Sequence, residues 1–475
     1  MKVILADVRP AKNIVCNKDL SGGFGTSSDF GSSLAMKFIK FLKGKNINIP
    51  ILSLGYLSGI FSGKGWRVEL VRDVSEFGEA DLVLVHTSLI AHAEELAFAK
   101  IARQYSKVGF TGPLASVRPQ IFLKHGDFVI AGEPESWAMD FNPSELSSLR
   151  GIIESPMVLE LDRLPFPNWL PFKYEAFSYS IYLKNKPIFP VQSSRGCPLS
   201  CKYYCPYTVV SSGAYRARSV ENTLKEIRRL KEHYGAKGII FRDPTFTINR
   251  KRVINFCKKI MDSGLCIDWA CETNLSNLDY ELIDLMRAAG LKGINVGVET
   301  VDEAVVKQTH RHSAAADRIR DLISYCEDNG VKTGAFYILG APQDTADTIT
   351  RTLKFSQAIN SSYAQFTICT PYPGTKFYDD ISDKIYEKEW EKFDLYTPVF
   401  HHGNLSPEQL KRFREKAFLN YYFRPGYVSA RLKRWFIHDF LNGSHRVSWE
   451  KGTDGIDRKR PVRQVPCKKQ VTPCH

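Results

Sequence analysis

The sequence predicts an α/β protein with two parallel-sheet domains followed by a helical C-terminal region. Three observations lead to this fold class. Residues 1–150 alternate short apolar runs with helical patterns, residues 186–385 repeat a strand-and-helix unit six times, and a Pro-rich, aromatic stretch at 151–185 separates the two parts. Strands that alternate with helices pair in parallel, so each part predicts one parallel sheet.

Length and composition indicate a globular protein of two or three domains. The chain has 475 residues, 43% of them hydrophobic and 24% charged, and this length exceeds one ordinary core. No apolar run approaches the roughly 18 to 20 residues that span a membrane, and the start MKVILADV reads as a first strand rather than a signal peptide. We therefore expect a cytoplasmic, reducing environment. The net charge of +14 attracts phosphates, anionic lipids or an acidic partner without selecting among them.

The first 150 residues predict a doubly wound sheet, whose ligands bind at the carboxyl ends of the strands. The predicted strands are 3–6, 66–71, 80–86, 108–111 and 127–131, and the predicted helices are 52–61 and 91–105. The glycine-rich run from Ser21 to Ser33 lacks the lysine of a P-loop. We interpret it as a flexible loop over an active-site mouth rather than as a phosphate cradle.

Residues 151–185 predict a connector, because the prolines of LPFPNWLPF fix φ and remove backbone donors. Residues 186–385 predict a partial (β/α)6, TIM-like barrel with functional groups where its strands end. The strands are expected at 188–192, 238–241, 266–271, 293–298, 333–339 and 364–368. The helices are expected at 220–234 behind the cap Ser219, and at 250–263, 279–289, 315–329 and 345–359.

Three cysteines follow the first barrel strand. In PVQSSRGCPLSCKYYCPY, which starts at Pro190, Cys197, Cys201 and Cys205 have the spacing C-x3-C-x3-C. Three thiolates can hold three irons of a [4Fe-4S] cluster and leave the fourth iron open for reaction. One alternative is a zinc site, for which no fourth ligand is visible near the loop. Another is disulfide bonding, which would leave one of three thiols unpaired.

This loop resembles the cluster loop of the radical S-adenosylmethionine (SAM) superfamily, and SSRGCP is similar to the cobalamin-binding branch of that superfamily. The resemblance implies that the three cysteines bind [4Fe-4S] and that SAM chelates the open iron. Reductive cleavage of SAM would then yield a 5′-deoxyadenosyl radical. The usual spacing is C-x3-C-x2-C, so this loop has one extra residue before Cys205. Tyr204 matches the aromatic residue that packs near the adenine in the family.

The resemblance also implies SAM-binding residues at later strand ends. Asp243, in FRDPTF, matches a position that binds the SAM amino group, and a helix cap or loop ion pair is the alternative. Glu299, in GINVGVET, matches the acidic residue near the SAM ribose or methionine. Glu272 and Asn274, which end the third strand, are further candidates. The sequence assigns no catalytic residue.

Two further pairs complete the candidate SAM site. Lys307 and Arg311, one helical turn apart, could meet the SAM carboxylate, with a solvated helix face as the alternative. Gly340 in ILGAPQDT and Gly374 in TPYPGTKFYDD would let backbone approach a bound nucleoside.

The first 150 residues resemble the Rossmann-like, cobalamin-binding-type domain that precedes the radical core in many of these enzymes. The similarity lies in ILSLGYLSGIF at 51–61, GFTGPLAS at 109–116 and DFVIAGEPES at 127–136. The motif D-x-H-x-x-G is absent, so no histidine is placed by it to ligate cobalt from below, and Leu114 stands where relatives often carry His. We expect bound cobalamin, with a vestigial scaffold as the alternative.

Residues 386–455 predict a helical region, and the basic segment 456–475 predicts a disordered tail. Within the helical region, YYFRPGYVSARLKRWFIHDFL at 421–441 resembles the C-terminal helices of cobalamin-type radical SAM enzymes. Its mixture of basic and aromatic residues predicts either peripheral contact with an anionic membrane or packing against the barrel mouth.

Taken together, these features predict a radical SAM enzyme that uses cobalamin to methylate an unactivated carbon of a small-molecule or lipid-like substrate. A lipid, a pigment, a peptide or an antibiotic precursor would all be compatible. The expected partner is a one-electron donor of the flavodoxin or ferredoxin type. Within the same class, the alternative is a radical cyclase, oxidase or rearrangement enzyme. The alternative from another class is a basic nucleic-acid-binding protein with a zinc site, but the interleaved aromatics of such a module are not visible, so no nucleic acid is expected.

Overall fold

The computed structural model describes residues 1–10, 16–27, 36–37, 46–199, 201–211, 213–309 and 311–429. The chain divides into two compact units, residues 1–418 and 419–475. The first unit contains both predicted sheets. No helix in the described ranges is both long enough and apolar enough to cross a membrane.

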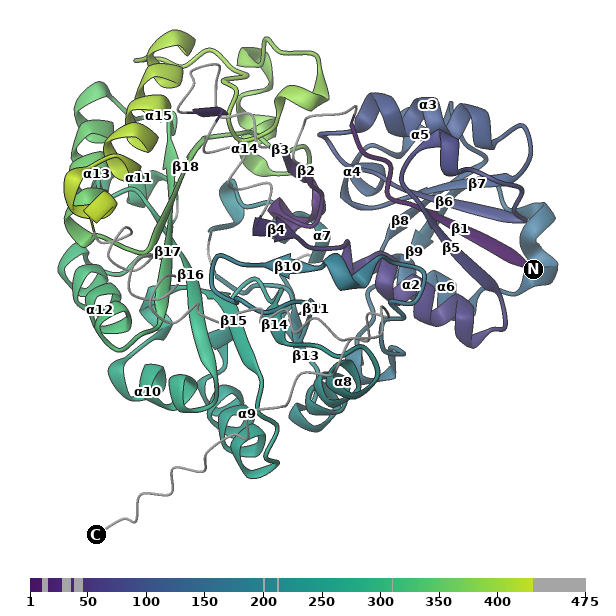
Figure 1. Ribbon diagram of the computed structural model, residues 1–475. Coiled ribbons are helices and arrows are strands. Elements are labelled where there is room, and N and C mark those ends of the chain that lie inside the picture. Colours follow the sequence, from purple (N-terminus) through teal and green to yellow (C-terminus); the bar gives the residue numbers. More distant parts are fainter. Residues whose placement is uncertain are drawn as a thin grey trace, which may run out of the picture. The chain divides into compact units, whose positions relative to one another are not determined.

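The N-terminal sheet has six parallel strands in the order β5-β1-β6-β7-β8-β9 (Figure 1). The strands are β1 (Lys2–Ala6), β5 (Arg67–Val71), β6 (Leu82–His86), β7 (Lys107–Thr111), β8 (Phe128–Gly132) and β9 (Gly151–Ser155). The helices around it are α2 (Leu52–Gly63), α3 (His92–Ala102), α4 (Pro113–Val117), α5 (Pro119–Leu123) and α6 (Pro134–Asp140). All five residues of β6 are buried, as expected of a strand covered on both faces. The predicted doubly wound sheet is confirmed.

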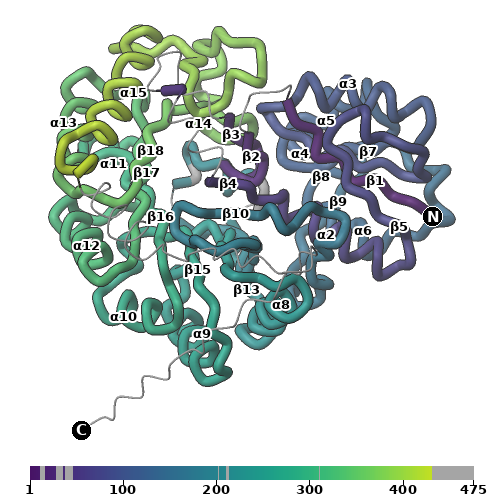
Figure 2. Tube along the Cα trace, in the orientation of Figure 1, coloured from purple at the N-terminus to yellow at the C-terminus, as the bar shows by residue number. Residues whose placement is uncertain are grey.

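The second sheet also has six parallel strands, and they follow one another in chain order as β11-β14-β15-β16-β17-β18. The strands are β11 (Ile188–Val191), β14 (Gly238–Phe241), β15 (Asp268–Thr273), β16 (Leu291–Glu299), β17 (Lys332–Leu339) and β18 (Tyr363–Ile368). The helices between them are α8 (Val220–His233), α9 (Arg250–Asp262), α10 (Tyr280–Ala288), α11 (Glu303–Gln308), α12 (Ala316–Asp328) and α13 (Ala346–Ile359). Figure 2 shows α9, α10, α12 and α13 along one side of these strands. The predicted partial (β/α)6 barrel is confirmed.

The ends of the barrel helices are set by local chemistry. Ser219 accepts a hydrogen bond from the backbone of Asn222 and so caps α8, in which Val220, Ile227 and Leu230 are buried. Asn249, Asp279 and Thr345 cap α9, α10 and α13 in the same way. Such caps satisfy amides that the first helical turn leaves without partners. The helix boundaries therefore lie close to those that the sequence predicted.

Further elements lie outside the two six-stranded sheets. They are β2 (Cys16–Asn17) with β3 (Thr26–Ser27), β4 (Ile47–Asn48) with β10 (Ser178–Tyr179), β12 (Ser194–Arg195) with β13 (Arg216–Ala217), and the helices α7 (Tyr207–Ser211), α14 (Lys376–Asp380) and α15 (Pro407–Tyr422). The confirmed part of the helical C-terminal region is α15. Most of the candidate membrane segment 421–441 and the whole tail 456–475 lie outside the described residues.

The segment 151–185, which the sequence predicted as a connector, contains regular secondary structure. It contains β9, which completes the first sheet, and β10, which pairs with β4. Trp169 in this segment is fully buried and packs so closely on α2 that a Cβ at Gly55 would overlap its ring. The prolines exclude regular structure over only part of this segment. Burial of its aromatic side chains stabilises the fold and holds the rest of the segment in place.

Candidate functional site

The cysteine loop begins where the first barrel strand ends. After β11 the chain forms β12, which pairs antiparallel with β13, and then turns at Gly196. Gly196 has φ +81, and a Cβ there would overlap the carbonyl oxygen of Ala214, so the turn admits only glycine. Cys201 starts a 3-10 helix that ends at Tyr203, and the amide of Cys205 donates to the carbonyl of Cys201 at 3.1 Å.

The three thiols of this loop lie close enough to interact electrostatically. Burial raises the pKa of Cys205 to about 12, and the neighbouring Cys201 and Cys197 add to the rise. Bound iron would favour the thiolate over the thiol, since a nearby cation reverses this shift. The Sγ of Cys197 lies 3.5 Å from the hydroxyl of Thr245, just after β14. Among the described residues, no three His, Cys, Asp or Glu side chains converge on a point that could hold one metal ion. A [4Fe-4S] cluster does not require three side chains to converge on one metal ion, because each cysteine binds a different iron.

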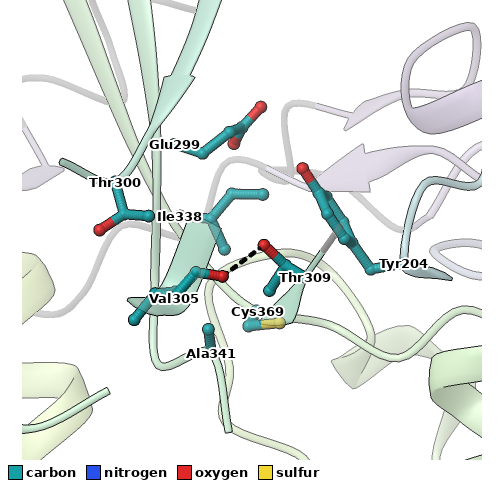
Figure 3. A pocket seen from close by; sticks show the side chains of 8 residues that line it. All are labelled: Tyr204, Glu299, Thr300, Val305, Thr309, Ile338, Ala341 and Cys369. Carbon is teal, nitrogen blue, oxygen red and sulfur yellow. Dashed lines mark hydrogen bonds between the residues drawn. The ribbon is translucent and has the colours of Figure 1, made fainter. Parts of the chain in front are cut away.

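A small pocket adjoins the loop. Its lining residues come from the loop, from the ends of β16, β17 and β18, and from α11 with its C-cap, and they are Tyr204, Glu299, Thr300, Val305, Thr309, Ile338, Ala341 and Cys369 (Figure 3). Tyr204 lies across the pocket from Thr300, and the hydroxyl of Thr309 donates to the carbonyl of Val305 at 2.7 Å. Two of the predicted SAM-binding residues, Tyr204 and Glu299, are therefore brought together at one cavity.

Glu299 has an unusual backbone conformation. Its φ is +65, and the register between β16 and β17 shifts between Gly297 and Glu299. Non-glycine residues adopt left-handed angles mainly where the surroundings impose them, commonly at functional sites. Burial raises the pKa of Glu299, and the positive charge of Arg311 counteracts this rise. Arg311 Nη1 lies 3.2 Å from Glu299 Oε1, so Arg311 contacts a pocket-lining residue without lining the pocket itself.

Asp243 lies beside the loop rather than in the pocket lining. It is fully buried, and its carboxylate accepts hydrogen bonds from the backbone amide of Ser193 at 2.7 Å and from the hydroxyls of Ser193 and Ser194 at 2.6 Å. These bonds engage both carboxylate oxygens. The geometry of Asp243 is that of a brace for the strand that leads into the cysteines, and direct SAM binding by it stays a prediction.

The remaining candidates lie outside the pocket lining. Gly340 has φ +80 and its α-carbon faces Leu410, whereas Gly374 has φ +87 and faces Val209 and Val117. Both glycines thus permit close protein packing, and backbone approach to a nucleoside stays a prediction. Lys307 is exposed on α11. Two further candidates are bound elsewhere: Glu272 pairs with Arg242 at 2.7 Å, and Asn274 caps the turn at Ser276 and donates to the carbonyl of His312.

Sequence reasoning missed several residues that hold the site. Thr245 contacts Cys197, Cys369 lines the pocket, and Gly297 leaves room for the Arg311–Glu299 pair. Arg195 and Glu133 tie the loop to the N-terminal sheet through a pair at 3.0 Å. The pattern FRDPT could have indicated Thr245, because it stands two residues after Asp243. The other contacts depend on chain segments that are distant in sequence.

The N-terminal sheet has its own cluster of polar side chains at the strand ends. Its strand order reverses between β1 and β6, and such switch points are where open α/β sheets bind ligands. Asp7 follows β1, and His86 and Thr111 end β6 and β7 as direct register partners. Each of the three is buried, and Asp7 Oδ1, Thr111 Oγ1 and both ring nitrogens of His86 have no hydrogen-bond partner among the described residues. Buried polar atoms without partners suit a ligand that carries donors and acceptors, and the amide-rich corrin of cobalamin has this chemistry.

Comparison with known proteins connects these features to a family. Residues 191–356 match the model of the radical SAM superfamily. An uncharacterized methyltransferase of Pyrococcus horikoshii is 26% identical over 384 residues, which cover 75% of this chain and 82% of the relative. An anaerobic magnesium-protoporphyrin IX monomethyl ester cyclase of Rubrivivax gelatinosus is 27% identical over 279 residues, 56% of this chain and 49% of the relative. The chain thus spans about half the length of that cyclase.

Solved structures share the fold. The radical S-adenosylmethionine methyltransferase TsrM from Kitasatospora setae, with tryptophan and a SAM analogue bound, superposes with a TM-score of 0.59 at 14% identity, covering 81% of this chain and 76% of TsrM. The cobalamin-dependent S-adenosylmethionine radical enzyme OxsB superposes with a TM-score of 0.55 at 15% identity, covering 82% and 56% of the two chains. Residues 191–356 thus resemble the radical SAM superfamily, and the chain shares its fold with cobalamin-dependent radical SAM enzymes over most of its length.

Proposed function

We propose that the protein is a radical SAM enzyme that uses a [4Fe-4S] cluster, SAM and cobalamin to methylate an unactivated carbon. The observation that carries this proposal is the loop of Cys197, Cys201 and Cys205 at the carboxyl end of the first barrel strand, beside the pocket that Tyr204 and Glu299 line. Functional groups of barrel enzymes collect at this end of the strands.

In this proposal the residues divide into three roles. Cys197, Cys201 and Cys205 each bind one iron. Tyr204, Glu299 and Arg311 bind SAM from the pocket side, with Gly340 and Gly374 shaping the surrounding loops. Asp243 positions the strand before the loop through its bonds to Ser193 and Ser194. The cluster and SAM supply the radical, while the chain binds, orients and excludes water.

Cobalamin would bind at the carboxyl ends of β1, β6 and β7. The unpartnered atoms of Asp7, His86 and Thr111 are its candidate hydrogen-bonding partners. Cobalamin supplies the methyl group when bound. The names of the methyltransferase relatives and the cobalamin-dependent enzymes that share the fold support this assignment.

The substrate in this proposal is a small or lipid-like molecule, and the electron donor is a small protein of the ferredoxin or flavodoxin type. Tryptophan is bound in TsrM, and other relatives are a cytidylyl-2-hydroxyethylphosphonate methyltransferase and a bacteriochlorophyllide d methyltransferase. The substrates in these names are very different compounds. The names therefore support methylation as the reaction and do not favour one substrate. A cytoplasmic location and peripheral membrane contact through residues 421–441 remain part of the proposal.

A second candidate is a radical cyclase without methyl transfer. It is favoured by the similarity to the Rubrivivax gelatinosus cyclase at 27% identity. The two candidates differ in their products: methyl transfer adds a methyl group to the substrate, and cyclisation does not. Mass spectrometry of reaction products with methyl-labelled SAM therefore separates them.

The experiment that tests the proposal uses anaerobically purified, cluster-reconstituted protein. We expect about four irons per chain, cobalamin by absorbance, and 5′-deoxyadenosine from SAM under dithionite. The Cys201→Ala variant should lose the iron and the SAM cleavage. Cys266→Ala is the matched control, because Cys266 is an exposed cysteine outside the loop, and it should retain both.

The outcomes separate the parts of the proposal. Zinc in place of iron, with no SAM cleavage, would refute the radical SAM assignment and favour a structural metal site. Iron and SAM cleavage without cobalamin would refute the methylation mechanism and favour the cyclase-type candidate.

A further inference from the structure

The guanidinium of Arg311 lies against the cysteine loop. Its Nη1 donates to the Sγ of Cys201 at 3.8 Å and to the hydroxyl of Tyr204 at 3.3 Å. Its Nη2 donates to the carbonyl of Gly297 at 2.7 Å. Only 12% of the side chain is exposed. One buried cation thus contacts a predicted iron ligand, the neighbouring aromatic residue and the end of β16.

The end of β16 is shaped to admit this cation. A Cβ at Gly297 would stand 2.5 Å from Glu299 Oε1 and 2.6 Å from Arg311 Nη2, distances that real contacts do not reach. The left-handed backbone of Glu299 places its carboxylate 3.2 Å from the same guanidinium. Glycine at one position and a strained residue at another are both needed for the arrangement, which argues against a chance surface pair.

Arg311 retains one unused donor. Its Nε is buried and has no hydrogen-bond partner among the described residues. A buried donor without a partner is costly unless a ligand satisfies it. The predicted SAM carboxylate has the chemistry to do so, and Arg311 would then contact the cluster loop and SAM with different nitrogens of one rigid fork.

We propose that Arg311 is a positioning residue that holds the cysteine loop against β16 and favours the reduced state of the cluster. Reduction adds one negative charge to the cluster, and a buried cation that donates toward a cysteine sulfur stabilises this charge. Glu299 offsets part of the effect, because its carboxylate faces the same guanidinium. This inference rests on the proposed function, since it requires a cluster on the three cysteines.

The test is a redox titration of reconstituted protein, followed by the electron paramagnetic resonance signal of the reduced cluster. In Arg311→Gln we expect the ratio of reduced to oxidised cluster at a fixed potential to fall about tenfold, which is a midpoint shift of about 59 mV to more negative values for one electron. Gly297→Ala keeps the charge but crowds the guanidinium, so its midpoint should shift in the same direction by a smaller amount.

Arg320→Gln is the matched control. Arg320 is half-exposed on α12 and pairs with Asp317, so its loss changes net charge equally without touching the loop, and its midpoint should equal that of the wild type. An Arg311→Gln midpoint that also equals the wild type would overturn the inference. If that variant retains no iron, Gly297→Ala decides, and an unshifted midpoint there overturns the inference as well. Wild-type protein without iron would instead overturn the proposed function, and this role of Arg311 with it.

Discussion

Glu133 and Arg195 form a buried ion pair that joins the N-terminal sheet to the cysteine loop. Glu133 follows β8, and Arg195 stands two residues before Cys197, with Arg195 Nη1 and Glu133 Oε2 3.0 Å apart. Arg216, the register partner of Arg195 across β12 and β13, reaches the other oxygen of Glu133 at 2.5 Å. None of the three side chains is more than 10% exposed. Glu135 Oε2 also lies 3.3 Å from Arg195 Nη1, so two buried carboxylates face two adjacent arginines beside the predicted iron ligands.

Glu133→Gln should destabilise the protein and loosen the loop. The substitution removes the carboxylate charge that pairs with Arg216 and one of the two carboxylates that pair with Arg195, and breaking a buried pair in this way costs roughly 3–5 kcal/mol. We expect a lower midpoint of urea unfolding and faster alkylation of Cys197 in the metal-free protein. Glu154→Gln, an exposed position on β9, is the control and should leave both unchanged. Equal behaviour of the two variants would show that the pair contributes nothing.

Gly196→Ala should abolish iron loading. Its added Cβ would overlap the carbonyl oxygen of Ala214 in a backbone with φ +81, so the turn before Cys197 cannot keep its path. Gly235→Ala is matched to it, because Gly235 has φ +65 but no atom within 4 Å of a new Cβ. That control should lose about 1 kcal/mol of stability for the left-handed conformation and still bind iron. Normal iron content in Gly196→Ala would contradict the predicted cluster loop.

His86 should make the stability depend on pH. Burial, reinforced by the charge of Lys18 and opposed by Asp7, lowers the pKa of His86 to about 3. The unfolded chain binds a proton at His86 below a pH of about 6.5 and the folded chain does not, so stability is complete above this pH and falls as the pH drops. Between pH 6.5 and 5 the loss is about 2 kcal/mol.

The measurement is the urea midpoint of the cobalamin-free protein from pH 5 to pH 8. In His86→Phe the decline below pH 6.5 should be shallower than in the wild type, since the ring volume remains and the titrating group is gone. His233→Gln, at the end of α8 on the barrel, should keep the wild-type slope. Parallel slopes for wild type and His86→Phe would refute the effect.

Two glycines of α2 should respond in opposite ways to alanine. At Gly55 a Cβ would overlap the buried ring of Trp169, whereas at Gly63 it would meet no atom within 4 Å. Overpacking of a core typically costs about 1–3 kcal/mol, while alanine in an open helical position gains up to about 1 kcal/mol. Thermal unfolding should therefore shift down for Gly55→Ala and not down for Gly63→Ala. A neutral Gly55→Ala would mean that Trp169 is not held against α2.

The sequence by itself determined the order and type of the main elements. Apolar periodicity and capping residues such as Ser219 are local signals, and the barrel strands and helices begin and end within a few residues of the predicted positions. The three cysteines were visible for the same reason, because the whole motif lies within nine residues. The local signals did not predict the structure of residues 151–185. The prolines of this segment indicated a connector, and neither β9 nor the burial of Trp169 was predicted.

Only the tertiary structure decided which side chains meet. Arg311 reaches Tyr204 and Cys201 across about a hundred residues of sequence and pairs with Glu299, and Glu133 reaches Arg195 from the other sheet. Asp243, predicted as a SAM ligand by its position, has both carboxylate oxygens hydrogen-bonded to Ser193 and Ser194, and SAM binding by it stays a prediction. Parallel strands bring their carboxyl ends together whatever their separation in sequence. The position of a motif in the sequence can therefore show that a residue lies at the end of a strand. Which side chain that residue contacts depends on packing across the sheet.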